Sequence, residues 1–218
     1  MIVRPFSEQL RNAVGSDWIS VVGHKFVHEL AHDRISDHAY ARYLVLDYAF
    51  LEILVAHVGQ AVATAPGMTA KRRYAEFLAV LTGGEDDYFR RSFSAMGVEE
   101  SRWKFPSAHP VLDGFREVML TGRHEKNYAN VLAALLPVEW VYLSWAQSVA
   151  TCTPERFYLK EWIELHVDRD FESFVVWMRT EMDEIGTRMT SDQVRVVTDI
   201  FRRTVALEVL FFDAAYES

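Results

Sequence analysis

Segments of the chain that are apolar on nearly every side carry five carboxyl groups, and three of these are candidates for chemistry. The three are Asp47, Glu139 and Glu208, and their segments are 43–58, 131–145 and 204–216. A carboxyl group buried without a partner loses the hydration of its charged form, so its pKa rises. Such an acid either belongs to a structural network with an arginine, a tyrosine or a backbone amide, or it transfers protons in a functional site. Both interpretations stay open here.

Aromatic rings follow two of these acids at helical spacing. Phe50 lies three residues after Asp47, and Phe211 and Phe212 lie three and four residues after Glu208. Residues three or four apart share one face of a helix, so each acid has a ring beside it. An acid next to aromatic rings suits a flat heteroaromatic ligand, whereas the alternative is an ordinary aromatic core.

A proline interrupts the apolar run that contains the third acid. Pro137 removes a backbone donor and clashes with the carbonyl four residues back, which predicts a kink. We infer that such a kink opens a cavity, and Val138, Tyr142 and Trp145 follow on one helical face that can line it. Glu139 points about 100° away from Val138, because each step along an α-helix turns by that angle. Core packing of the two aromatic rings is the alternative.

The elements that position these residues are predicted to be helices only. Apolar residues recur every three or four positions, and the 6 prolines and 10 glycines fall mostly at breaks. No stretch alternates apolar and polar residues over the length of a strand. We predict an all-α bundle in one domain, 1–218, with helices over 7–15, 18–32, 36–64, 68–96, 108–122, 125–151, 155–184 (broken near 167) and 190–216.

Composition excludes several classes of protein. The 218 residues carry a net charge of −8 and are 50% hydrophobic, so a disordered chain and a nucleic-acid-binding protein are both disfavoured. Cys152 is the only cysteine, which leaves no internal disulfide and no thiolate metal cluster. No run reaches the ~18 uninterrupted apolar residues of a membrane span, and no apolar signal core is present. We expect a soluble cytoplasmic protein that binds neither nucleic acid nor membrane.

An ordered series of short motifs resembles the TenA family, also called thiaminase II. The series covers the chain from about residue 17 to residue 217. Its members are His24, Phe26, Tyr43-Leu44-Val45-Leu46-Asp47-Tyr48, Asn127-Tyr128-Ala129, Ala133-Ala134-Leu135-Leu136-Pro137-x-x-Trp140-x-Tyr142, Trp162-Ile163 and Glu208-x-x-Phe211-Phe212-x-x-Ala215-Tyr216.

The resemblance implies a haem-oxygenase-like helical bundle that assembles as a homo-oligomer, a dimer or a tetramer. It implies a closed pocket for a 4-amino-2-methylpyrimidine ring and no cofactor or metal. The family cleaves the bond between the methylene carbon of that ring and an amine or a thiazolium, and it serves thiamin salvage.

Site residues follow from the resemblance position by position. Asp47 would hydrogen-bond the exocyclic amine and a ring nitrogen, Glu208 would be the acid/base group, and Tyr142 would position the substrate through its hydroxyl. The rings lining the pocket would be Phe50, Phe115 and Phe211. Phe50 and Phe115 stand where the family commonly has tyrosine.

Two departures from the family pattern change the expected chemistry. Val138 occupies the position of the catalytic cysteine, and a valine cannot act as a nucleophile. Cys152 lies fourteen residues further on and is expected to be inert. His166 replaces a family tyrosine four residues after Trp162. Covalent cleavage of thiamin is therefore not expected.

Hydrolysis without a cysteine is the function that we predict. The substrate would be aminomethyl- or formylaminomethyl-pyrimidine, and the reaction needs a positioned water, a base and an acid for the departing amine. Glu208 is the first choice for proton transfer, Asp47 orients the ring, and Glu139 or His166 is a second proton carrier. Val138, Glu139 and His166 are also expected to contact the substrate.

Three alternatives stay open. Residues 28–32 spell H-E-x-x-H, a zinc-protease signature, although no third ligand is evident. An iron-dependent oxidase of the same architecture would need two Glu-x-x-His pairs, and only Glu29-x-x-His32 fits. A pocket that binds a pyrimidine or another small aromatic molecule without converting it is the third alternative, because Val138 is compatible with lost chemistry.

Overall fold

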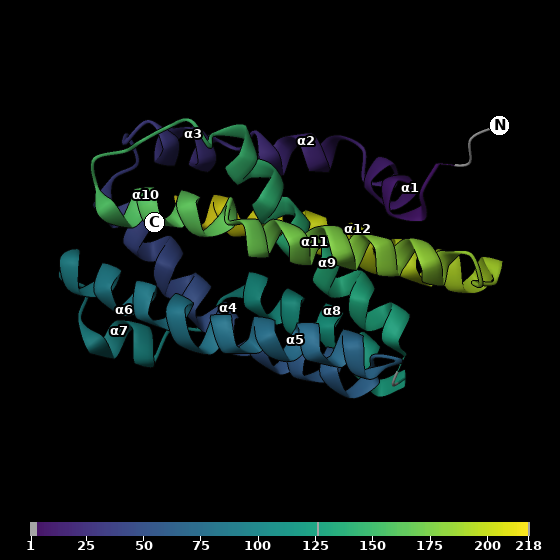
Figure 1. The fold of residues 1–218 in the computed structure, drawn as a ribbon. Helices are drawn as coiled ribbons and strands as arrows, with labels where there is room; N and C mark the ends of the chain where they lie inside the picture. The colour runs from purple at the N-terminus through teal and green to yellow at the C-terminus, as the bar shows by residue number, and fades with distance from the viewer. Residues whose placement is uncertain (1–3, 126, 218) are drawn as a thin grey trace.

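The computed structural model describes the backbone of residues 4–125 and 127–217, and the side chains of these residues except 121–125. Every regular element in these ranges is a helix (Figure 1). The all-α prediction is confirmed. The elements are α1 Phe6–Ala13, α2 Ser16–Val22, α3 Lys25–Ala31, α4 Asp37–Thr64, α5 Met68–Val80, η1 Leu81–Glu85, α6 Asp86–Ala95, α7 Glu100–Lys104, α8 Pro110–Glu125, α9 Tyr128–Ser148, α10 Phe157–His166, α11 Arg169–Gly186 and α12 Ser191–Ala214.

Helix α9 forms the centre of the bundle. It packs against α2, α4, α8, α10, α11 and α12, and Figure 1 shows it between the first three helices on one side and α4–α8 on the other. Nearly all of its residues from Asn130 to Ala146 are buried, since a helix that is apolar on every side is stable only inside the protein. The helix continues through Pro137 without a break.

Two helices, α4 and α9, are long and apolar enough to cross a membrane by length and composition alone. The apolar window of α9 is 89% buried in the bundle, which identifies it as a core helix, whereas that of α4 is 44% buried. Burial in the hydrophobic core therefore explains the apolar character of α9.

Helices α4 and α12 carry two of the three acids beside α9. Ser36 begins α4, its hydroxyl accepting from the amide of Ala39 at 3.1 Å. Thr190 begins α12 in a capping box with Gln193, which satisfies two free amides. Both helices contact α9 and each other, so Asp47, Glu139 and Glu208 are brought to one region.

Several predicted boundaries differ from the structure. The predicted helix 18–32 is two helices, because Gly23 ends α2 and His24 caps α3 through its ring nitrogen. The short helix α7 was not predicted. The break near residue 167 is confirmed, since Val167 ends α10 and Asp168 caps α11 through its carboxylate.

The predicted helix 68–96 contains a π-helical turn. Its residues Leu81–Glu85 separate α5 from α6 and contact α4. A π-turn adds one residue to the helical repeat, so the side chains after it face a different direction from those expected in a continuous α-helix, and such turns are frequent at functional sites. This element determines where Glu85 points.

A pair of glycine substitutions should have opposite effects on stability. A Cβ at Gly186 would lie 2.8 Å from the Cβ of Phe6, so Gly186→Ala must separate α11 from α1 and should lower the free energy of unfolding by ~1–2 kcal/mol. A Cβ at Gly59, inside α4, meets nothing within 4 Å, so Gly59→Ala should raise it by ~0.5–1 kcal/mol. Urea unfolding of both variants measures these changes, and equal effects would contradict the close approach at Gly186.

Candidate active site

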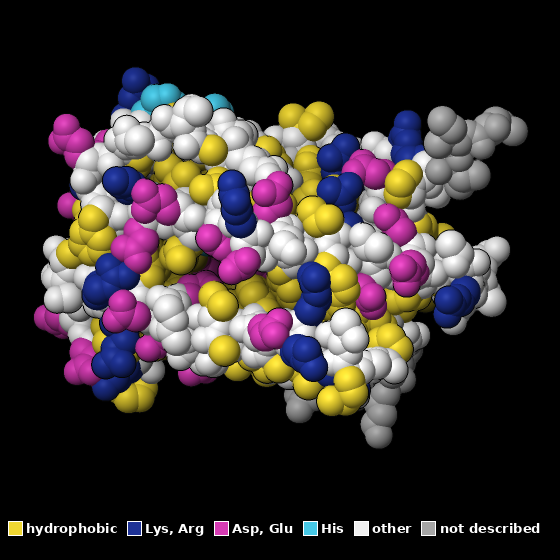
Figure 2. All heavy atoms as spheres, viewed as in Figure 1, with side chains coloured by type: hydrophobic (Ala, Val, Ile, Leu, Met, Phe, Trp, Pro, Cys, Tyr) yellow, Lys and Arg dark blue, Asp and Glu magenta, His cyan; other side chains and the backbone are white. Residues whose placement is uncertain are grey.

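A cavity of about 590 Å³ lies between α4, α5, η1, α9, α10 and α11. Figure 2 shows this face of the molecule hollowed between α5 and the helices α10 and α11. Exposed side chains of Glu76, Asp168 and Asp170 stand among its lining, so the cavity reaches the surface. The resemblance implied a closed pocket. In the structure the pocket is open to the surface instead, between α5 and α11.

Most of the candidate residues lie in the wall of this cavity. The lining includes Asp47, Phe50, Val138, Glu139, Tyr142 and His166. They come from three helices, α4, α9 and α10, which meet only in the folded bundle. The sequence predicts that these residues share one site, and the fold brings their side chains to one cavity.

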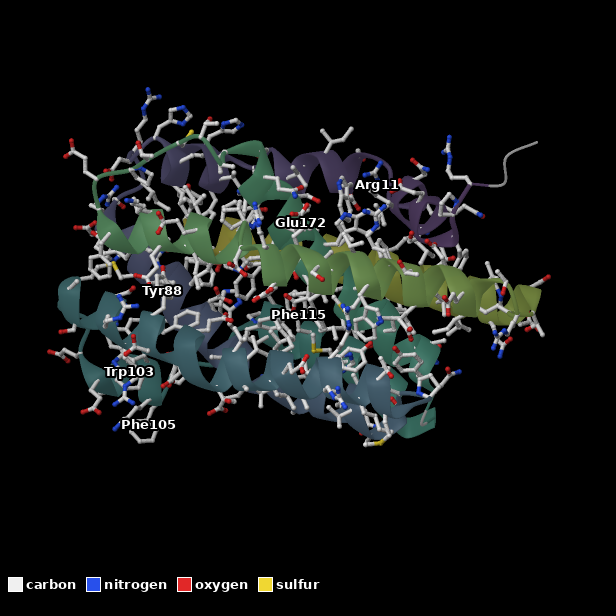
Figure 3. The ribbon with its side chains drawn as sticks, in the orientation of Figure 1. Arg11, Tyr88, Trp103, Phe105, Phe115 and Glu172 are labelled. Atoms are coloured by element: carbon white, nitrogen blue, oxygen red, sulfur yellow. The ribbon has the colours of Figure 1, made fainter. Side chains whose placement is uncertain are left out.

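Three candidates lie behind the wall. Phe115 and Phe211 pack against Phe50, with ring centroids 4.6 and 5.8 Å from its own, and Figure 3 shows Phe115 in the interior of the bundle. Glu208 is only 1% exposed and lies close enough to Asp47 and Glu139 for their charges to interact. None of the three is among the residues lining the cavity.

Asp47 is buried in a network of two tyrosines. The Tyr43 hydroxyl bonds to its carboxyl group, and it also meets the Tyr142 hydroxyl at 2.9 Å. Burial raises the pKa of Asp47 to about 7, although the bond from Tyr43 acts in the opposite direction. Its Oδ2 atom has no hydrogen-bond partner among the described residues, so it is available to a ligand.

Glu139 and Glu208 are buried acids with a free oxygen each. The Oε1 atoms of both lack a hydrogen-bond partner in the described part of the chain. Burial raises the pKa of each carboxyl group well above its ordinary value, and the nearby acids raise it further. Both groups therefore hold a proton more tightly than an exposed carboxyl group does, and each can donate it.

Glu85 is a further acid in the cavity wall, and nothing in the sequence predicts its place there. It lines the wall at the end of the π-turn, where the residue is half-buried and its carboxyl group is desolvated. Burial, followed by the charge of Asp47, raises the pKa of Glu85 to about 8. The only available signal was Gly83-Gly84, which indicates an irregularity but not the direction of the next side chain.

His166 is held as a neutral imidazole. Its Nδ1 atom lies 2.8 Å from the Trp162 carbonyl oxygen, which only accepts, so Nδ1 carries the proton and Nε2 keeps its lone pair. Burial lowers the pKa of His166 to about 4. The ring lies 5.0 Å from that of Tyr142, centroid to centroid. His166 can therefore accept a hydrogen bond at neutral pH, but it cannot act as a general acid there.

The charges around the cavity favour a ligand that donates hydrogen bonds. Its described wall has the buried carboxyl groups of Asp47, Glu85 and Glu139 and, where it reaches the surface, the exposed acids Glu76, Asp168 and Asp170, while Arg73 of α5 is its single Lys or Arg side chain. Acceptor oxygens without partners are satisfied by N–H groups, and aromatic walls suit a flat ring. An amino-substituted heterocycle fits both features.

The H-E-x-x-H sequence does not form a zinc site. Helix α3 ends at Ala31, and the Nδ1 atom of His32 donates to the His28 carbonyl oxygen at 2.8 Å. The carboxylate of Glu29 accepts from the Tyr216 hydroxyl at 2.7 Å. Among the residues that the structure describes, no group of three or more His, Cys, Asp or Glu side chains is arranged to hold a metal ion. The zinc and iron alternatives therefore have no support in this geometry.

The buried titratable groups predict an unusual pH dependence of stability. The pKa values of Asp47 and Glu85, about 7 and about 8, lie above those of an unfolded chain, so the stability that these groups contribute is lost as the pH rises through these values. His57 and His166 have pKa values lowered to about 4, so they oppose folding only below pH 6.5. From pH 7 to 8.5, the free energy of unfolding should fall by ~1.4 kcal/mol per pH unit for each proton that the folded state retains.

Urea unfolding at pH 7 and pH 8.5 tests this dependence. The slope should be shallower in Glu85→Gln, which removes one of the protons lost in this range. Constant or rising stability over the interval would mean that the buried acids are ionised in the folded protein.

The chain is similar to known proteins along nearly its whole length. The chain matches the TENA/THI-4/PQQC family over residues 12–218. It is 22% identical over 216 residues to an aminopyrimidine aminohydrolase of Helicobacter pylori, covering 97% of this chain and 99% of that protein.

Solved structures share the fold. A TenA homologue from Pyrococcus furiosus superposes with a TM-score of 0.86 at 20% identity, covering 97% of this chain and 100% of that one. A domain with a heme oxygenase-like fold from Shewanella denitrificans superposes with a TM-score of 0.69 at 14% identity, covering 99% and 93%. The predicted haem-oxygenase-like bundle is confirmed, and the chain belongs to the TENA/THI-4/PQQC family.

Proposed function

We propose that this protein is a hydrolase of the thiamin-salvage type, which releases the amine or formylamine from an aminomethyl-pyrimidine. The observation that carries the proposal is the meeting of Asp47, Glu139 and Tyr142 in the wall of one aromatic cavity, with Glu208 directly behind them. The curated relative from Helicobacter pylori, similar along nearly the whole chain, is named for aminopyrimidine hydrolysis.

The reaction proceeds by acid/base catalysis without a covalent intermediate. Val138 lines the cavity, and the resemblance implies that it replaces the family's cysteine; its hydrocarbon side chain cannot attack the ring. Water forms a C–O bond to the methylene carbon while the C–N bond breaks with its electron pair going to nitrogen. One carboxyl group takes a proton from the water, and another gives a proton to the departing nitrogen.

Each residue has a separate task in this reaction. Asp47 accepts hydrogen bonds from the exocyclic amine through its free oxygen, and Tyr142 orients the substrate through the hydroxyl that also meets Tyr43. Glu208 moves protons from behind the wall. The rings of Phe50 and Trp162 flank the pyrimidine.

The working form of the protein is proposed to be a homo-oligomer, a dimer or tetramer of single-domain chains spanning 1–218, in the cytoplasm. The family resemblance supports this, and exposed apolar side chains such as Ile19, Phe105 and Leu210, 53–81% exposed, are available to an interface. Light scattering of the purified protein measures its mass, and a monomer at micromolar concentration would contradict the proposal.

A substrate comparison tests the function. The protein is incubated with aminomethylpyrimidine and, separately, with thiamin, and the hydroxymethyl product is followed by chromatography. We expect turnover of the first compound alone. Cleavage of thiamin would contradict chemistry without a nucleophile. Binding of both compounds with turnover of neither would favour the pyrimidine-binding alternative, which the valine at position 138 also fits, and iron-dependent oxygen uptake would favour the oxidase.

A further inference from the structure

Two acids in the cavity wall, Glu85 and Glu139, have no assigned role in the reaction proposed above. Glu85 comes from the π-turn and Glu139 from the middle of α9, so they approach the cavity from different elements. Both line the space that a ligand would fill, whereas Glu208 lies behind it. A group that exchanges protons with a substrate must reach it directly or through one water. Position therefore favours Glu85 and Glu139 for the proton transfers.

The two acids differ in how far they are withdrawn from water. Glu139 is 5% exposed and its Oε1 atom has no partner within the described residues, so this polar atom is buried without compensation. Glu85 is half-buried and ends the π-turn, in which Thr82, Gly83 and Gly84 are exposed. Their charges interact across the cavity. Two carboxyl groups that interact in this way resist being ionised together.

We propose that Glu85 and Glu139 act as a catalytic pair that holds one proton, with Glu139 as the acid for the departing nitrogen and Glu85 as the base for water. The proposal rests on the proposed hydrolysis. As the C–N bond breaks, the Glu139 carboxyl group gives its proton to the nitrogen, and Glu85 takes a proton from the water that forms the C–O bond. The pair ends with one proton, now on Glu85, which returns to Glu139 before the next turnover.

Other titratable groups around the pair set its behaviour with pH. Asp47 of α4, Tyr142 of α9 and the neutral His166 of α10 share the inner wall, and Glu208 of α12 lies behind them. At the opening stand Arg73 and Glu76 of α5, with Asp170 of α11 and Asp168, which caps that helix. The inner acids add negative charge, which disfavours a second ionisation within the pair. Burial raises the pKa of Glu85 to about 8 and raises that of Glu139 well above its ordinary value, and the charge of Glu85 opposes ionisation of Glu139.

Kinetics of single variants test the pair. Glu85→Gln and Glu139→Gln should each lower kcat on aminomethylpyrimidine by ~10²-fold or more while KM stays within a few-fold, because the loss is confined to proton transfer. The parent rate should rise with pH as Glu85 ionises, and this limb should be absent in Glu85→Gln. Glu52→Gln, an exposed acid on α4 outside the cavity, is the matched control and should keep the parent kinetics.

Carbon-13 titration of glutamate carboxyl groups supplies a readout that does not need turnover. The parent should show a carboxyl resonance titrating above pH 6.5 that disappears in Glu85→Gln, and the titration of Glu139 should then move to lower pH. Normal kcat in Glu85→Gln, or titration of Glu85 near 4.5, would overturn the pair. A parent protein that shows the coupled titration but does not hydrolyse aminomethylpyrimidine would overturn the proposed function and the catalytic role of the pair. The interaction between the two carboxyl groups would still be established.

Discussion

Replacement of Glu208 by glutamine should lower kcat on aminomethylpyrimidine by ~10²–10⁴-fold, the range for loss of a general acid or base. Glutamine has nearly the same shape as a protonated glutamate, so the helix packing around this 1%-exposed residue is preserved. It cannot release or accept the proton that Glu208 exchanges with the acids in front of it. KM should change little, because Glu208 is not in the wall that contacts the substrate. Steady-state kinetics over pH 6–9 measure both constants.

The stability of this variant is a built-in control. Burial raises the pKa of Glu208, so the unfolded chain ionises at a lower pH than the folded protein and the parent loses stability as the pH rises. Glu208→Gln removes this ionisation, so its melting temperature should match the parent's at low pH and exceed it at pH 7. A folded variant with normal kcat would show that Glu208 only fills space. The acids that line the cavity would then transfer protons without a relay through Glu208.

The helical fold was predictable because its signals are local. Spacing of apolar residues along α4 and α12, and caps such as Ser36, depend on neighbours in the chain, so a sequence shows them. The break between α2 and α3 was missed because Gly23 and His24 sit within an apolar pattern that continues across them. Boundaries set by a single cap are weak signals in any periodic stretch.

The candidate site was predictable in part for a different reason. Asp47 and Glu139 stand out because an acid in an apolar helix is costly, and their position in the cavity wall agrees with that interpretation. Glu85 has no such mark, since its direction results from the π-turn and not from its neighbours in sequence. The sequence also does not show that Phe115 and Phe211 lie behind the cavity wall. A buried ring gives the same sequence pattern whether it lines a cavity or packs behind a ring that lines it.

Replacement of Asp47 by asparagine should weaken binding more than it slows the chemical step. The carboxyl group has a free oxygen beside the cavity, and hydrogen bonds involving a charged group contribute ~1.5–3 kcal/mol. Losing them should raise the Kd for aminomethylpyrimidine ~10–150-fold, by the relation of affinity to free energy. Calorimetric titration measures the Kd directly. An unchanged Kd would mean that the ring is held elsewhere in the cavity.

The pH dependence of binding separates the charge of Asp47 from its shape. Because the pKa of Asp47 is raised to about 7, the parent's affinity should change between pH 6 and 8, and that change should vanish in Asp47→Asn. Tyr43→Phe is the companion variant, since it keeps the carboxyl group and removes the hydroxyl that bonds to it and to the Tyr142 hydroxyl. The bond from Tyr43 lowers the pKa of Asp47, so its loss should move the parent's pH dependence to higher pH while leaving the maximal affinity nearly intact. A Tyr43→Phe profile identical to that of the parent would place the titration on another acid, and Glu85, with a pKa of about 8, would be the first to examine.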